Sequence, residues 1–130
     1  MSGNRNRGGQ GSDISVLVLE DDKEIQNIIQ LIADRVGENF CCEFVGSIAE
    51  FKSSFQKGKY KAVILDNGVS DGRAIEQDVA QWVWSKNRNV EIAFNSGMPF
   101  EELEKRLGIR NLDKDPRYIK LFFARLKNGI

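Results

Sequence analysis

The sequence predicts an α/β protein built on a parallel sheet. The first indication is a set of short apolar runs, several of them rich in β-branched residues, which suit strands buried on both faces. These runs lie at 14–19, 40–45, 62–65, 90–94 and 109–113. The second indication is that apolar residues recur at helical spacing after each run. Strands that alternate with helices in this way predict a five-stranded, doubly wound sheet with helices on both faces.

The composition fits one cytoplasmic domain that follows a disordered tail. The chain has 130 residues, 41% of them hydrophobic, and its 19 Lys and Arg balance its 19 Asp and Glu. No net field therefore favours nucleic acid or a membrane surface. Residues 1–12 are glycine-rich and polar, so we expect disorder there and a domain at 13–130. With no secretory signal, the adjacent Cys41 and Cys42 indicate a reducing compartment rather than a disulfide framework.

Three acids, Glu20, Asp21 and Asp22, follow the first predicted strand at once. An amphipathic helix comes next, and its buried face would carry Ile25, Ile28, Ile29, Ile32 and Val36. The free N–H groups of its first turn favour anions and account for one or two of the acids. A third carboxylate indicates a bound cation, unless all three serve as capping and first-turn residues.

The third predicted strand ends abruptly at Asp66, and a polar loop runs from there to Gly72. A carboxylate at the carboxyl end of a central strand lies where open α/β sheets keep their ligands. Asp66 therefore belongs either to a ligand site or to the turn itself, as an acceptor of loop hydrogen bonds. The helix before this strand should start with a capping box of Ser47 and Glu50. The helix after it would carry Ile75, Val79, Trp82 and Val83.

The last part of the chain repeats the pattern. The fourth predicted strand ends in small polar residues that include Ser96. Pro99 suits the first turn of a helix whose inward side would carry Phe100, Leu103 and Leu107. Lys114 follows the weak fifth strand, and Asp115 with Pro116 would start the last helix. The apolar face of that helix comprises Ile119, Phe122, Phe123 and Leu126.

These strand ends bring one set of polar side chains to the carboxyl edge of the predicted sheet. The set consists of Glu20, Asp21, Asp66, Ser96 and Lys114. Three carboxylates together need a hard divalent cation, and oxygen ligands without histidine suit Mg²⁺. An ammonium and a hydroxyl beside them suit a phosphoryl group. The set therefore predicts phosphoryl transfer to a carboxylate, with Asp66 as the nucleophile.

In these segments the sequence resembles the receiver domain of two-component response regulators. The matching pieces are VLVLEDD, VILDNGVSDG, AFNSG and NLDK, in the order that the family has them. The resemblance runs from Ile14 to about Leu126 and implies a flavodoxin-like fold. It implies that Asp66 is the phosphoacceptor, Ser96 the switch hydroxyl and Lys114 the phosphate-binding lysine.

The same resemblance implies a Mg²⁺ site. In it Asp21 would bind the metal directly, Glu20 would act through water, and Asp66 and the backbone carbonyl of Gly68 would be further ligands. The implied protein is a stand-alone receiver domain. It would accept a phosphoryl group from a histidine kinase or phosphotransfer protein and signal by contact with a downstream protein. It would catalyse only its own phosphorylation and dephosphorylation.

Several positions depart from the family pattern. Ser70 stands where a proline is usual, Asp115 follows the lysine directly where the family has proline, and Ala74 replaces a frequent glycine. Asn111 occupies the position of an aromatic that swings inward on activation, and the fourth helix looks short. These changes lie on the face that usually signals output and leave the phosphoryl chemistry intact.

Two other functions stay open at this point. The first is a receiver-like binding module that is never phosphorylated, which Asn111 and the short fourth helix favour. The second is a metal-dependent phosphatase of α/β type with Asp66 as nucleophile. Such a phosphatase usually has a second acid two residues after the nucleophile, where this chain has Gly68.

Overall fold

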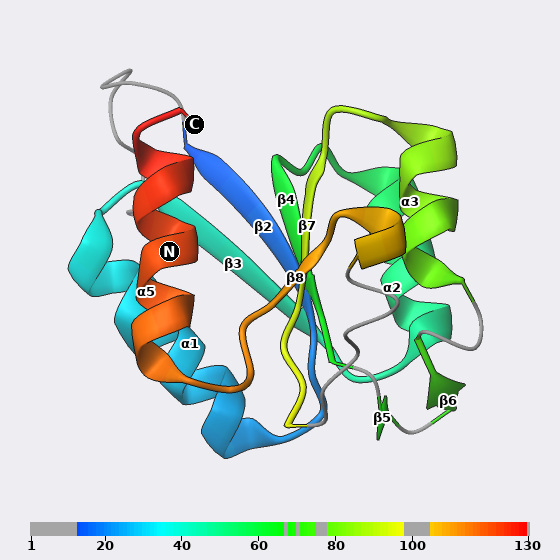
Figure 1. The fold of residues 1–130 in the computed structure, drawn as a ribbon, viewed down its shortest axis with the longest axis horizontal. Coiled ribbons are helices and arrows are strands. Elements are labelled where there is room, and N and C mark those ends of the chain that lie inside the picture. Colours follow the sequence, from blue (N-terminus) through cyan, green and yellow to red (C-terminus); the bar gives the residue numbers. More distant parts are fainter. Residues whose placement is uncertain (1–12, 67, 70, 75–77, 98–104, 130) are drawn as a thin grey trace.

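A five-stranded parallel sheet forms the centre of the chain (Figure 1). The computed structural model describes residues 13–66, 68–69, 71–74, 78–97 and 105–129. The strand order is β3-β2-β4-β7-β8, and every neighbouring pair is parallel. The strands are β2 (Ile14–Leu19), β3 (Phe40–Val45), β4 (Ala62–Leu65), β7 (Glu91–Phe94) and β8 (Arg110–Asn111). The predicted fold class is confirmed, and β8 is shorter than the expected run at 109–113.

Alternate residues of the central strands are buried in two separate hydrophobic cores, one on each face of the sheet. Val16 and Val18 of β2 are fully buried on one face of the sheet, whereas Leu17 and Leu19 are fully buried on the other. A strand with both faces covered has no need of a polar side, which explains the continuous apolar runs in the sequence. None of the described helices is long and apolar enough to cross a membrane.

Helices cover both faces of the sheet (Figure 1). On one face α1 (Lys23–Val36) and α5 (Pro116–Lys127) pack side by side, with Ile29 and Phe123 at the centre of their core. On the other face lie α2 (Ile48–Lys57) and α3 (Val79–Lys86).

The sequence-predicted starts of two helices are confirmed by their caps. Ser47 Oγ accepts the N–H of Glu50 at 3.1 Å, and Asp115 Oδ1 accepts the N–H of Arg117 at 2.9 Å. Each cap satisfies an N–H that lacks a partner within its own helix.

The third helix begins later than the sequence predicted, and the loop after Asp66 is correspondingly longer. Gly68–Val69 (β5) and Gly72–Arg73 (β6) pair as a short antiparallel hairpin, and α3 begins at Val79. The predicted helical positions Ile75, Phe100 and Leu103 lie outside the described residues. Leu107, the other expected core residue of the fourth helix, packs half-buried against the core.

The strand order places a switch point between β2 and β4. The chain moves from β2 outward to β3, then crosses back to add β4, β7 and β8 on the other side. At such a point the two loops that leave neighbouring strands diverge and open a crevice at the carboxyl edge. The residues that directly follow β2 and β4 therefore face each other across this crevice.

Candidate functional site

The three acids after β2 have three different surroundings. Asp22 is the N-cap of α1, and its Oδ1 accepts the N–H of Glu24 at 2.9 Å. Asp21 is exposed. Glu20 is 1% exposed, and its Oε2 accepts the N–H of Asp22 at 3.1 Å. The helix start thus uses one acid as a cap and leaves two carboxylates for the crevice.

Asp66 joins these two carboxylates from the neighbouring strand. It directly follows β4, is 6% exposed, and donates its backbone N–H to Leu19 O at 2.9 Å. This bond continues the pairing of β2 with β4 and fixes Asp66 beside the end of β2. One carboxylate oxygen from each of Glu20, Asp21 and Asp66 lies within 4.8 Å of the others.

Glu20 shows the electrostatic cost of this arrangement. Burial and, next, the negative charge of Asp66 raise the pKa of Glu20 from 4.5 to about 7. The N–H of Asp22 and the ammonium of Lys114 act in the opposite direction and only partly offset the rise. Glu20 Oε1 is buried and has no hydrogen-bond partner within the described residues. A carboxylate buried in this way needs a positively charged partner if it is ionised, and otherwise it takes up a proton.

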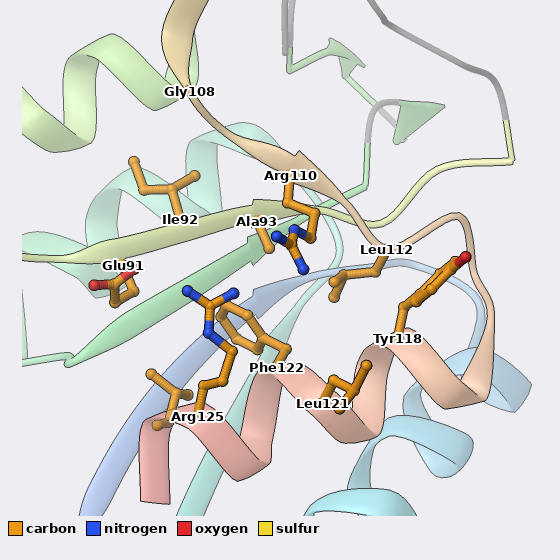
Figure 2. Close-up of a pocket in the computed structure, with 11 residues that line it drawn as sticks. Glu91, Ile92, Ala93, Gly108, Arg110, Leu112, Tyr118, Leu121, Phe122 and Arg125 are labelled. Carbon is orange, nitrogen blue, oxygen red and sulfur yellow. The ribbon is translucent and has the colours of Figure 1, made fainter. Parts of the chain in front are cut away.

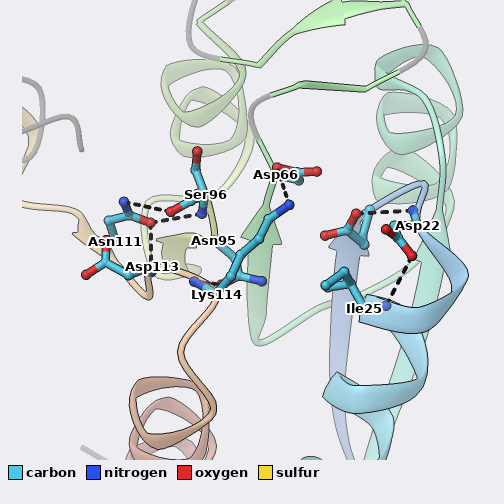
Figure 3. A network of polar contacts seen from close by, with 9 residues as sticks. Asp22, Ile25, Asp66, Asn95, Ser96, Asn111, Asp113 and Lys114 are labelled. Carbon is cyan, nitrogen blue, oxygen red and sulfur yellow. Dashed lines mark hydrogen bonds and ion pairs between the residues drawn. The ribbon is translucent and has the colours of Figure 1, made fainter. Parts of the chain in front are cut away.

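Lys114 brings one positive charge to the acids. Its Nζ lies 3.7 Å from Asp66 Oδ1, and the lysine side chain is about one-third exposed while that of Asp66 is buried. Figure 3 shows the side chain reaching from the turn after β8 toward Asp66. Asp113 and Lys114 both have left-handed backbones, with φ of 56° and 55°.

Ser96 follows β7 and is 5% exposed. Its backbone is bonded to the side chain of Asn111, whose Oδ1 accepts the N–H of Ser96 at 3.0 Å. In Figure 3 Ser96 lies beside Asn111, on the far side of Lys114 from the acids that follow β2. The three carboxylates thus lie together with the ammonium of Lys114 beside Asp66, and Ser96 stands at the end of the neighbouring strand.

Comparison with solved structures gives consistent neighbours. An orphan response regulator of H. pylori matches with a TM-score of 0.69 and 17% identity, over 88% of this chain and 94% of its own. A CheY-like receiver domain protein from Methanospirillum hungatei matches with a TM-score of 0.72 and 15% identity, over 92% and 100%. The chemotaxis response regulator CheY4 of Vibrio cholerae matches with 0.72 and 17%, over 88% and 99%. The chain has the receiver-domain fold of response regulators. No family model matches it, and no curated protein does.

Within this receiver fold the predicted site residues fall into two groups. Glu20, Asp21, Asp66 and Lys114 converge on the crevice. Ser96 stands at the neighbouring strand end, and Gly68 is the exposed first residue of β5. The ligand role of the Gly68 carbonyl stays a prediction.

Three polar residues near the crevice were not predicted as supports from the sequence. Asn95 and Asn111 hold the ends of β7 and β8, and Asp71 accepts the N–H groups of Ile48 and Ala49 at the start of α2, at 2.7 and 3.0 Å. No local pattern could reveal the role of Asp71, because the helix that it caps lies more than 20 residues earlier in the chain.

The donor set at the crevice fits Mg²⁺. The cluster of Glu20, Asp21 and Asp66 offers only oxygen atoms, which are the ligands that this hard cation takes. The unpartnered Oε1 of Glu20 is a second observation in favour, since a cation or a metal-bound water would satisfy it.

A separate hollow of about 140 Å³ lies between α5 and the strands β7 and β8 (Figure 2). Arg110 and Arg125 reach into it, and Tyr118, Leu121 and Phe122 form its apolar side. Its lining has one acid, Glu91, so it lacks the carboxylate cluster of the crevice.

Proposed function

We propose that this receiver domain accepts a phosphoryl group on Asp66, with Mg²⁺ bound at the crevice, and passes a signal on by protein contact. The observation that carries the proposal is the convergence of three acids and one lysine at the switch point. A cluster of two buried acids and one exposed acid beside a partly exposed lysine suits a site that binds a cation and a doubly charged anion together.

In the proposed reaction a carboxylate oxygen of Asp66 attacks the phosphorus of a phosphodonor. A new P–O bond forms on Asp66 while the bond from phosphorus to the donor breaks, and the donor leaves with the electron pair. Attack by water on the same phosphorus later releases phosphate and restores Asp66. Such transfer needs positioning and charge neutralisation more than covalent help from the protein.

The chain's own residues divide this work. Lys114, already beside Asp66, would neutralise an oxygen of the phosphoryl group, and Ser96 would donate its hydroxyl proton to another. Glu20, Asp21 and Asp66 would hold Mg²⁺, which supplies neutralisation of the acids and of the transferring group. The buried position of Asp66 limits access by water and favours attack on a donor that is presented from the open edge.

We propose a histidine kinase or a phosphotransfer protein as the donor and a second protein as the target. Either donor would present a phosphorylated histidine. Its imidazole is a good leaving group once it is protonated. The neighbouring folds named above are those of response regulators, and that likeness supports this choice of donor class.

Incubation with acetyl phosphate tests the proposal. Intact mass should rise by one phosphoryl group when Mg²⁺ is present, and should not rise with a chelator. Asp66→Asn should abolish uptake, because an amide is a poor nucleophile. Asp71→Asn is the matched control, an aspartate on the same loop that is engaged with α2, and it should still take up the group.

Uptake by Asp66→Asn, or none by the wild type with Mg²⁺, would contradict the proposal. In the second case the binding module that is never phosphorylated becomes the better function. The immobilised Asn111 in place of a mobile aromatic favours that alternative.

A further inference from the structure

Two buried asparagines cross-link the ends of β7 and β8 (Figure 3). Asn95 follows β7, and its Oδ1 accepts the N–H of Lys114 at 2.9 Å. Asn111 is the last residue of β8, and its side chain pairs with the backbone of Ser96. Its Oδ1 accepts the N–H of Ser96 at 3.0 Å, and its Nδ2 donates to the carbonyl of Ser96 at 3.2 Å. Asn95, which follows β7, therefore holds a residue that comes after β8. Asn111, the last residue of β8, holds a residue that comes after β7.

The cross-link lies in the interior, where polar groups are costly. Asn95 is 1% exposed, and both Asn111 and Ser96 are 5% exposed. A buried carboxamide is unfavourable unless its hydrogen bonds compensate for lost water. Asn95 Nδ2 has no hydrogen-bond partner within the described residues, so this residue is not optimised for packing. What it does provide is the bond to Lys114.

The same two side chains support a strained turn. Asp113 and Lys114 have φ of 56° and 55°, a left-handed backbone that is unfavourable for residues with a Cβ. Asn111 Oδ1 also accepts the N–H of Asp113, at 3.1 Å, while Asn95 holds the N–H of Lys114. Both left-handed residues are thus anchored by an asparagine. The turn directs Lys114 so that its Nζ lies 3.7 Å from Asp66.

We propose that Asn95 and Asn111 are positioning residues that fix Ser96 and Lys114 before a phosphoryl group reaches Asp66. The inference rests on the proposed function. Neither asparagine needs to touch the reacting atoms, since each acts on the backbone of a residue that does. Protein groups that are held in place beforehand bind a phosphoryl group without the entropic cost of ordering those groups.

Amide hydrogen exchange, followed by NMR, tests the cross-link without metal or phosphodonor. In the wild type the N–H groups of Ser96, Asp113 and Lys114 should be protected. Asn111→Leu should release Ser96 and Asp113 but spare Lys114, and Asn95→Leu should do the reverse. A general loss of structure would not produce this crossed pattern. Free exchange of Ser96 and Lys114 in the wild type would overturn the proposal even if neither variant folded.

Titration with beryllofluoride and Mg²⁺ tests the consequence for the site. This phosphoryl analogue should bind about tenfold more weakly to Asn95→Leu and to Asn111→Leu, a change of about 1.4 kcal/mol. Phe51→Leu is the control, because Phe51 is buried in the core on the α2 side of the sheet and makes none of the hydrogen bonds of the cross-link. It should leave the affinity unchanged.

Each outcome of the titration has one meaning. Equal affinity in the wild type and both asparagine variants overturns the positioning role and leaves the proposed function standing. Weaker binding in Phe51→Leu as well as in the asparagine variants also overturns it, because destabilisation alone would then explain the loss. A wild type that binds no beryllofluoride contradicts the proposed function and the positioning role together, and the exchange pattern then reports a purely structural cross-link.

Discussion

Glu20, Asp21 and Asp22 are consecutive in the chain, yet the fold gives each a different surrounding. The cap position of Asp22 lets its carboxylate bond to the start of α1, and Asp21 stays in water. Glu20 alone is turned into the interior, where Asp66 is its neighbour.

The pKa of Glu20 predicts how pH acts on the metal-free protein. The pKa is about 7 in the folded chain against 4.5 for an ordinary glutamate, so between these values the folded state binds more protons than the unfolded state. Stability should therefore fall as the pH rises from about 4.5 to about 7 and stay low above that. The loss at this buried group is on the order of 3 kcal/mol.

Urea unfolding at pH 5 and pH 8 in a chelator measures this effect. Glu20→Gln should remove most of the difference between the two pH values, because a glutamine does not ionise. Glu24→Gln, an exposed change in the first turn of α1, should retain it. A difference that survives unchanged in Glu20→Gln would show that another group is responsible.

At the scale of single elements, Asp71 ties the loop after Asp66 to the start of α2. Both of its carboxylate oxygens accept N–H groups there, and these bonds hold the pKa of Asp71 below its usual value. Asp71→Ala should lower the urea midpoint at pH 7 and speed amide exchange at Ile48 and Ala49 several-fold. Because Ser47 still caps Glu50, that third N–H should keep its protection.

Asp34→Ala serves as the control for this loop contact, since Asp34 is exposed and its carboxylate accepts a hydrogen bond from Gln30 within α1. It should leave exchange at Ile48 and Ala49 unchanged. Unaltered exchange at these two amides in Asp71→Ala would mean that the contact is not maintained in solution.

A strand or helix could be predicted from the sequence where its own residues show a clear pattern of apolar positions. The bounds of β2, β3 and β4 match the predicted runs, because a strand buried on both faces must be apolar throughout. The hairpin β5–β6 was missed, since its strands have two residues each and no periodicity. The acids, Ser96 and Lys114 could be predicted as candidate site residues because they lie just after the predicted strands. Asn95 and Asn111 were not found as supports, because their bonds join segments about 15 to 19 residues apart.

On the scale of the whole molecule, the question is how far from Asp66 the structure changes when a phosphoryl group binds. In the receiver family an aromatic at the position of Asn111 swings on activation. Here the carboxamide of Asn111 makes hydrogen bonds to Ser96 and Asp113, and it has no ring to insert. We therefore expect a site that binds its ligand with little movement of α5.

NMR shifts on addition of beryllofluoride and Mg²⁺ measure this reach. The largest should centre on Gly68, Ser96, Gly97 and Lys114. Residues of α5 that line the separate hollow, such as Leu121, should move little (Figure 2). Large shifts that pass through Asn111 into α5 would show a conformational readout that the hydrogen bonds of Asn111 do not prevent.

The place of β2 in the sheet has a consequence for the order of folding. This strand pairs with β3 on one side and with β4 on the other, although it precedes both in the chain. The nearer partner closes the shorter loop, so we expect β2 to pair with β3 before β4 arrives. Until then Glu20 and Asp21 remain solvated and far from Asp66. The repulsion among the three acids would thus arise only when β4 joins β2, and a divalent cation would act on that step.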